Sequence, residues 1–280
     1  MRRIARAAAA LLAAATLAAC GGRAAFVSPY ETGPPTAQSV GELRATLSER
    51  ASQHPKLWVR ADLVLESDLR KGRDAVTATA LFEEPDRFRL LGSREVVGTL
   101  FDVLLLGDNA SLYFAREGLR FDGTAEELRG KLGAAGSVMP RDLIEAVTVT
   151  QRLLATMEKP AGEWSAIDRR DHWLVATYDD LGRQSIYRVR KADGLVDEWL
   201  LRSADGVERL RIAYGEYRLV DVRGRKEPFP WRFEARVPEG NAKVRASVDG
   251  YKIDPPFVPK SFQPRQTDEV YALRDLAFEE

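Results

Sequence analysis

The sequence has only one cysteine, Cys20, and only two histidines, His54 and His172. A disulfide within the chain is therefore excluded, and so is a zinc site built from several cysteines. His54 stands before Pro55 at the expected end of a helix, and His172 stands in an expected turn, so both are interpreted as structural residues. The chain is expected to bind no metal and no cofactor.

The chain also lacks an excess of charge of one sign. It has 42 Lys and Arg residues against 42 Asp and Glu residues. A nucleic-acid partner would call for a basic stripe or patch, so nucleic acid is not expected to bind. No apolar run beyond Leu17 is long enough to span a bilayer as a helix.

The motifs of several large enzyme classes are missing. We find no HExxH zinc motif, no GxSxG elbow, no P-loop and no GxGxxG. The acidic pairs Glu83-Glu84 and Asp179-Asp180 stand beside turn residues, whereas a glycosidase needs two facing carboxylates. We therefore predict that the protein is not an enzyme. Four tryptophans in the second half allow a sugar-binding platform, but packing at strand positions is the favoured interpretation: Trp164, Trp173, Trp199 and Trp231.

The N-terminus has the pattern of an export signal. Three arginines precede a short apolar run, residues 7–17, which ends in Leu-Ala-Ala-Cys-Gly. This ending resembles the lipobox of bacterial lipoproteins and predicts a signal peptide over residues 1–19, with lipidation of Cys20 by acyl chains such as palmitate. An ordinary secretory signal is the alternative. Residues 20–38, rich in Gly, Pro, Ser and Thr, are expected to form a flexible tether.

The remainder, residues 39–280, is predicted to form one domain of the mainly β (α+β) class. A helix is expected over residues 39–53, a strand over 57–66, a meander of strands over 76–123, and two helices over 124–133 and 140–157. The strands expected in the second half are 173–178, 184–190, 195–202, 207–214, 218–222, 231–237 and 243–253. Their regular spacing favours one antiparallel sheet, which is too large to lie flat.

The segment Gly98–Leu106 is apolar on both parities and is interrupted only by Thr99 and Asp102. A strand with one solvated face would alternate with polar residues, so we expect this one to be central with both faces covered. One face would hold a ligand, and the other would meet the N-terminal helix or an apolar partner. The predicted ligand-binding set combines this strand with its two neighbours: Phe88, Leu90, Phe101, Val103, Leu105, Leu112 and Phe114.

The order of elements resembles the LolA/LolB superfamily of lipoprotein carriers. The resemblance rests on the lipobox, the N-terminal helix and three segments: Pro-Asp-Arg-Phe-Arg-Leu at 85–90, Phe-Asp-Val-Leu-Leu-Leu-Gly-Asp at 101–108, and Leu-Tyr-Phe at 112–114. It implies a strongly curved, unclosed antiparallel half-barrel whose concave face, covered by helices, holds acyl chains. The loop Gly92–Gly98, with Val96 and Val97, would take the place of the membrane-contacting loop of LolB-type carriers.

The sequence therefore favours one function and leaves a second as the alternative. The first is a lipid-anchored protein that binds an acyl chain or a lipidated protein in an apolar cavity, and so acts in lipoprotein or lipid trafficking. Gly21 and Gly22 follow the anchor cysteine where no Asp stands, which resembles an outer-membrane destination facing the periplasm. The second is a structural lipoprotein with a filled core that acts as a scaffold for other envelope proteins.

Overall fold

The computed structural model describes residues 37–67, 70–131, 140–160 and 162–276. The predicted signal peptide, most of the tether and Cys20 lie outside these residues. Within them the chain groups into two compact units. Unit 1 comprises residues 54–144 and 239–276, and unit 2 comprises residues 37–53 and 145–238. The prediction of a single domain over residues 39–280 stays a prediction.

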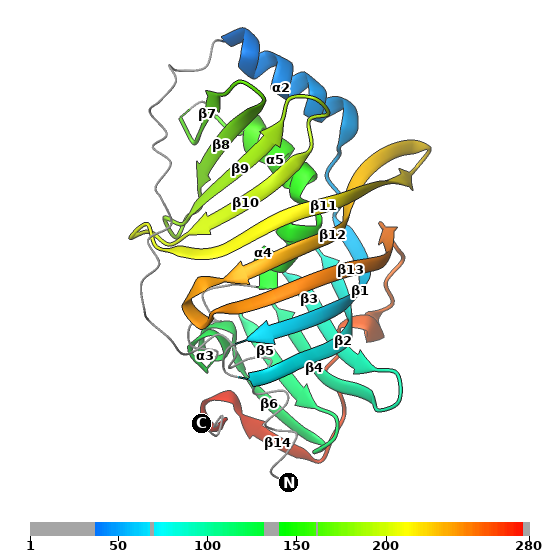
Figure 1. The fold of residues 1–280 in the computed structure, drawn as a ribbon. Coiled ribbons are helices and arrows are strands. Elements are labelled where there is room, and N and C mark those ends of the chain that lie inside the picture. The colour runs from blue at the N-terminus through cyan, green and yellow to red at the C-terminus, as the bar shows by residue number, and fades with distance from the viewer. Residues whose placement is uncertain (1–36, 68–69, 132–139, 161, 277–280) are drawn as a thin grey trace. The chain divides into compact units, whose positions relative to one another are not determined.

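Unit 1 is built on one sheet in the order β14-β6-β5-β4-β3-β2-β1-β13. All neighbours in it are antiparallel except β14 and β6, which are parallel. The sheet bends, so that β1 and β6 run in clearly different directions (Figure 1). Its strands are β1 (Lys56–Ser67), β2 (Arg70–Glu83), β3 (Arg87–Arg94), β4 (Gly98–Leu106), β5 (Asn109–Phe114), β6 (Leu119–Thr124), β13 (Ala242–Ile253) and β14 (Glu269–Ala272).

The helical elements of unit 1 are short. They are α3 (Ala125–Lys131), η3 (Pro259–Phe262) and η4 (Leu273–Asp275). The start of α3 has a capping box, because the Glu127 backbone N–H donates to Thr124 Oγ1 and the Thr124 N–H donates to Glu127 Oε2. The single helix predicted over 140–157 is instead two helices, α4 (Pro140–Val147) and α5 (Val149–Glu158). They are separated at Thr148, whose backbone is not helical (φ −118°, ψ 31°).

Unit 2 contains six antiparallel strands together with helices α2 (Ala37–Arg50) and α5. The order of these strands is β12-β11-β10-β9-β8-β7. Its strands are β7 (Trp164–Asp168), β8 (His172–Tyr178), β9 (Gln184–Arg190), β10 (Val196–Arg202), β11 (Glu208–Val222) and β12 (Arg225–Val237); the 3₁₀ turn η2 (Pro238–Gly240) follows β12. The predicted class, mainly β and antiparallel with a sheet that does not close into a barrel, is confirmed.

Three elements of the sheets differ from the sequence prediction. The strand β11 runs without a break where two strands were expected, because irregular pairing near Gly215 absorbs the residues between them. The short strands β7 and β14 were not predicted, since five and four residues are too few for a clear alternating pattern.

No helix of the described residues is long and apolar enough to cross a membrane.

Candidate functional site

The seven residues predicted to bind ligand lie on one face of strands β3, β4 and β5. Phe88 pairs with Leu105 and Leu90 with Val103 across β3 and β4. Across β4 and β5, Val103 pairs with Leu112 and Phe101 with Phe114. Residues directly opposite each other in an antiparallel ladder project to the same side. We call this side of unit 1 the α3 face.

Two short elements of the chain cover the α3 face. Leu128 of α3 packs on it, together with Leu273 of η4 and Leu276. Within the ligand-binding set, Leu112 is 0% exposed, and Phe88, Phe101, Val103 and Phe114 are also buried. Leu90 and Leu105 are only partly buried. The set is therefore brought together as the alternation predicts, and its role in ligand binding stays a prediction.

Glycines allow two close approaches on this face. The ring of Phe101 lies over Gly92, where a Cβ atom would stand 2.2 Å from the ring. At Gly123 a Cβ atom would stand 2.8 Å from Leu273 Cβ. Real Cβ atoms do not come so close to their neighbours, so glycine at 92 and 123 is what lets Phe101 and Leu273 reach the sheet.

The opposite side of β3 and β4 is covered by the C-terminal residues 255–276, which we call the strap; the side itself we call the strap face. Phe262 packs there on Leu81 and Leu104, with Phe257 beside it. Strand β4 is thus central with both faces covered, as predicted. The strap forms the cover at the place where the N-terminal helix or an apolar partner was expected.

A buried ion pair lies in the middle of the strap face. Arg89 donates two hydrogen bonds to Asp102, Nε to Oδ1 at 2.9 Å and Nη2 to Oδ2 at 2.5 Å. Their side chains are 8% and 3% exposed. Arg265 of the strap adds a bond from its Nε to Asp102 Oδ2 at 2.9 Å, and Arg89 Nη1 donates to the carbonyl of Ser261. Buried charges are stable only when paired in this way.

Arg89 alternates in the sequence with Phe88 and Leu90, and this pattern does not identify its partner. The sequence feature that indicates a buried ion pair is Asp102, a single carboxylate inside an otherwise apolar strand. A buried carboxylate needs a cation, and an arginine on a neighbouring strand is the first candidate.

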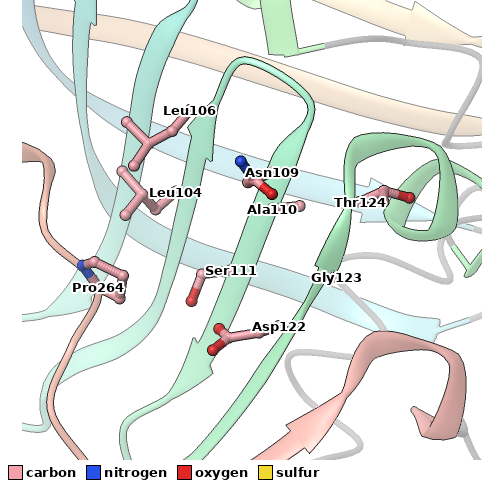
Figure 2. A pocket seen from close by; sticks show the side chains of 9 residues that line it. All are labelled: Leu104, Leu106, Asn109, Ala110, Ser111, Asp122, Gly123, Thr124 and Pro264. Atoms are coloured by element: carbon pink, nitrogen blue, oxygen red, sulfur yellow. The ribbon is translucent and has the colours of Figure 1, made fainter.

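A pocket of about 530 Å³ lies on the same face of the sheet, over β4, β5 and β6 (Figure 2). Two register rows form its floor: Leu106, Asn109 and Thr124 in one, and Leu104, Ser111 and Asp122 in the other. Pro264 of the strap makes one wall. Asp122 Oδ2 is held by Arg120, whereas Oδ1 is buried without a hydrogen-bond partner among the described residues. The pocket can therefore accept hydrogen bonds at a polar end and contact apolar groups at the other.

The predicted membrane-contact residues stand at the tip of the turn between β3 and β4. Val96 is 97% exposed and Val97 is 57% exposed. The turn closes with a bond from the Val97 N–H to the Arg94 carbonyl and with Gly98 at φ +77°. A β-turn this tight projects both valines away from the sheet.

The tryptophans and histidines considered as candidate site residues lie among packing or ion-pair partners. Trp173 and Trp199 are buried, which agrees with the packing interpretation. His172 lies 2.6 Å from its neighbour Asp171, and His54 lies 3.7 Å from Asp254. Among the described residues no group of three or more His, Cys, Asp or Glu side chains is arranged to hold a metal ion.

Comparison with known proteins rests on structure alone. No model of a known protein family matches the sequence, and no curated protein matches it either. Solved structures do match, and three of them are covered over most of their length. A domain described as an outer membrane lipoprotein-sorting protein from Vibrio parahaemolyticus is 10% identical with a TM-score of 0.52, over 80% of this chain and 95% of that chain.

The second is a DUF1329 family protein from Desulfovibrio piger, 9% identical with a TM-score of 0.55, over 81% of this chain and 96% of that chain. The third is a LolA superfamily protein from Nitrosomonas europaea, 12% identical with a TM-score of 0.49, over 82% and 98% of the two chains. At identities this low, likeness concerns the fold and not the activity. The chain therefore shares its fold with a domain described as lipoprotein-sorting and with a DUF1329 family protein.

Proposed function

We propose that the chain is a lipid-anchored protein of the cell envelope that binds an acyl chain on the α3 face of unit 1. The acyl chain belongs either to a lipid or to a lipid-modified protein. Cys20 carries the anchor, which holds the protein at the outer membrane with its body facing the periplasm. Binding is non-covalent, and no reaction is catalysed. The fold shared with a lipoprotein-sorting domain supports lipid or lipoprotein binding as the general function.

The observation that carries this proposal is the cover of the α3 face. Seven apolar side chains from three strands present a continuous surface. The buried cluster that contains four of them is covered, among the described residues, by α3, with seven residues, and by η4, with three, together with Leu276. Short elements have low local stability and open more readily than the sheet beneath them. Opening of this cover would expose an apolar surface that suits a hydrocarbon chain, which has no hydrogen bonds to satisfy.

The turn with Val96 and Val97 supplies the contact with the membrane in this proposal. Burying an exposed valine side chain in an apolar phase contributes roughly 1.5–2 kcal/mol. Two valines are too few to anchor the protein by themselves, so they would orient a body already held by the lipid at Cys20.

Titration with a fluorescent fatty-acid probe tests the proposal. We expect emission changes that saturate at micromolar probe. Phe101→Leu should retain the fold and alter the relative affinity for chains of different length, because it reshapes the centre of the α3 face. Phe229→Leu, at a fully buried position of β12 in unit 2, is the matched control and should leave the probe affinity unchanged.

The second candidate function is a protein-interaction scaffold with a permanently filled core. It is favoured by the fact that the described residues already bury most of the α3 face. The two functions separate in one comparison. If neither the wild-type protein nor Leu128→Ala, with its loosened cover, binds the probe at micromolar concentration, the carrier proposal fails and the scaffold replaces it.

A further inference from the structure

The strap follows a defined path from one face of the unit 1 sheet to the other. After β13 it crosses the strap face, where Phe257 and Phe262 form an edge-to-face pair with ring centroids 5.3 Å apart. Phe262 is 6% exposed. Phe257 is partly buried beside it, so the aromatic pair gives the strap an apolar attachment to the sheet.

The middle of the strap is attached by charged and backbone groups. Arg265 donates to Asp102, and its own carbonyl accepts a bond from Arg120 Nη1 at 2.7 Å. Thr267 then donates to the carbonyl of Gly118. These attachments all lie before the last strand of the strap, so residues 257–267 are held independently of β14 and η4.

The strap next turns around the edge of the sheet. Its strand β14 pairs with β6 over four residues, in parallel. Tyr271 lies on Phe121 at 5.7 Å between ring centroids, yet Tyr271 is 47% exposed and Val270 is 44% exposed. A four-residue parallel edge strand with exposed side chains is the least firmly attached part of the strap.

The end of the strap enters the α3 face. Leu273 is 0% exposed and Leu276 is 6% exposed. Both belong to the same cluster as Phe101, Leu112 and Phe114. Two branched aliphatic side chains at this place present the same chemistry as a few methylene groups of an acyl chain.

We propose that Leu273 and Leu276 occupy the acyl-binding space of unit 1 when no ligand is present, and that an acyl chain binds by displacing them. The inference rests on the proposed function and locates its site beside α3, against β5 and β6. The strap is then an internal competitor. Residues 257–267 stay attached on the strap face while β14 and η4 detach.

The strap has a firmly attached part, residues 257–267, and a loosely attached end, and this difference favours such an exchange. The attached part keeps the displaced end close to its site, so it returns as soon as the ligand leaves. An internal competitor lowers the apparent affinity by the fraction of molecules in which the site is open. Loosening the end of the strap should therefore raise the affinity for acyl chains, although it removes packing from the folded state.

Hydrogen exchange of the full chain, measured with and without palmitic acid, tests the displacement. We expect residues 269–276 to lose protection when palmitic acid binds, because β14 and η4 leave the sheet. Residues 149–158 of α5 in unit 2 should keep theirs. Palmitic acid that binds while residues 269–276 keep or gain protection would overturn the inference and leave the proposed function standing.

Affinity measurements on variants give a second, independent test. Leu273→Ala should raise the affinity for the fatty-acid probe about tenfold, since a smaller side chain competes less well. Arg265→Gln, which frees the middle of the strap but leaves Arg89 on Asp102, should give a smaller increase. Leu201→Ala, at a 2% exposed position of β10, controls for a general loss of packing and should leave the affinity for the probe unchanged. Equal affinity of Leu273→Ala and the wild type refutes the competitor, and no binding by any of these proteins refutes the proposed function as well.

Discussion

Each unit has a sheet face covered by helical elements, and the two covers differ in kind. In unit 2 the cover is α2 and α5, with 14 and 10 residues. Leu43, Leu47, Leu153 and Met157 of these helices are all 0% exposed. In unit 1 the cover is a seven-residue helix and a three-residue turn. Apolar side chains thus cover a sheet face in both units, carried by two longer helices in unit 2 and by much shorter elements in unit 1. In our proposal only the shorter cover opens.

Polar attachments strengthen the same contrast. Helix α2 is tied down by Arg44, which donates to the Met157 carbonyl, and by Arg50, which donates to the Asp193 carbonyl. Below the helices the rings of Tyr187 and Trp199 stack at 6.1 Å, nearly parallel. Burial of the Tyr187 phenol raises its pKa far above the usual value. Side-chain hydrogen bonds thus hold the cover of unit 2 in addition to its apolar packing.

The same substitution in the two covers should have the largest difference in effect. Leu153→Ala in α5 should lower the free energy of unfolding by about 3–5 kcal/mol, because the surrounding helices and sheet cannot collapse into the cavity. Leu128→Ala in α3 should cost about 2 kcal/mol or less, since a short helix relaxes or opens locally. Urea unfolding of both variants measures the difference. Equal losses would mean that the cover of unit 1 is as permanent as that of unit 2.

The contrast explains what the sequence could and could not predict. Alternation in β3 and β5, with the parity of β4 that does not contain Asp102, was enough to assign seven residues to one face, because register in a half-buried sheet follows from the apolar pattern. The covering elements were not predictable in the same way. The strap contains four prolines between residues 255 and 264, and such a segment has no periodicity to indicate which face it crosses or that it continues as β14.

Arg89 illustrates a second limit. Charged residues that alternate with apolar ones predict a solvated face, and that rule fails when the opposite charge comes from the next strand and the cover from a distant segment. Asp102 and Arg265 are 163 residues apart in the sequence. No local pattern connects them, so the buried ion pair appears only when the strap has been placed.

A smaller effect is expected where Phe101 rests on Gly92 in the α3 face. Gly92→Ala should cost about 1–3 kcal/mol, because the added Cβ would stand 2.2 Å from the Phe101 ring and would push it off the sheet. In a Phe101→Leu background the same change should cost clearly less, since the smaller side chain can move aside. A double-mutant cycle by urea unfolding measures this coupling. Additive losses would show that the alanine strains the backbone of β3 and does not act through the ring.

The smallest effect concerns the edge of unit 2, where α2 meets β7. Ser39 Oγ donates to Asp168 Oδ2 at 2.6 Å, and Lys191 donates to the other oxygen. The bond from Lys191, followed by that from Ser39, lowers the pKa of Asp168 below its usual value. A carboxylate with a lowered pKa in the folded state stabilises the fold at a pH above its unfolded pKa, and this contribution disappears as the pH falls through the folded pKa.

Asp168→Asn should therefore destabilise the protein at neutral pH by less than about 1 kcal/mol, because an exposed ion pair is well screened by solvent. The difference from the wild type should shrink as the pH falls below about 4, where the carboxylate of the unfolded chain is already protonated. Urea midpoints at pH 7, 5 and 3 measure it, with Asp180→Asn in the exposed turn after β8 as the matched change. If the difference in stability between Asp168→Asn and the wild type stays constant from pH 7 to 3, Asp168 holds α2 by hydrogen bonding alone. The charge of Asp168 would then contribute nothing to the attachment of α2.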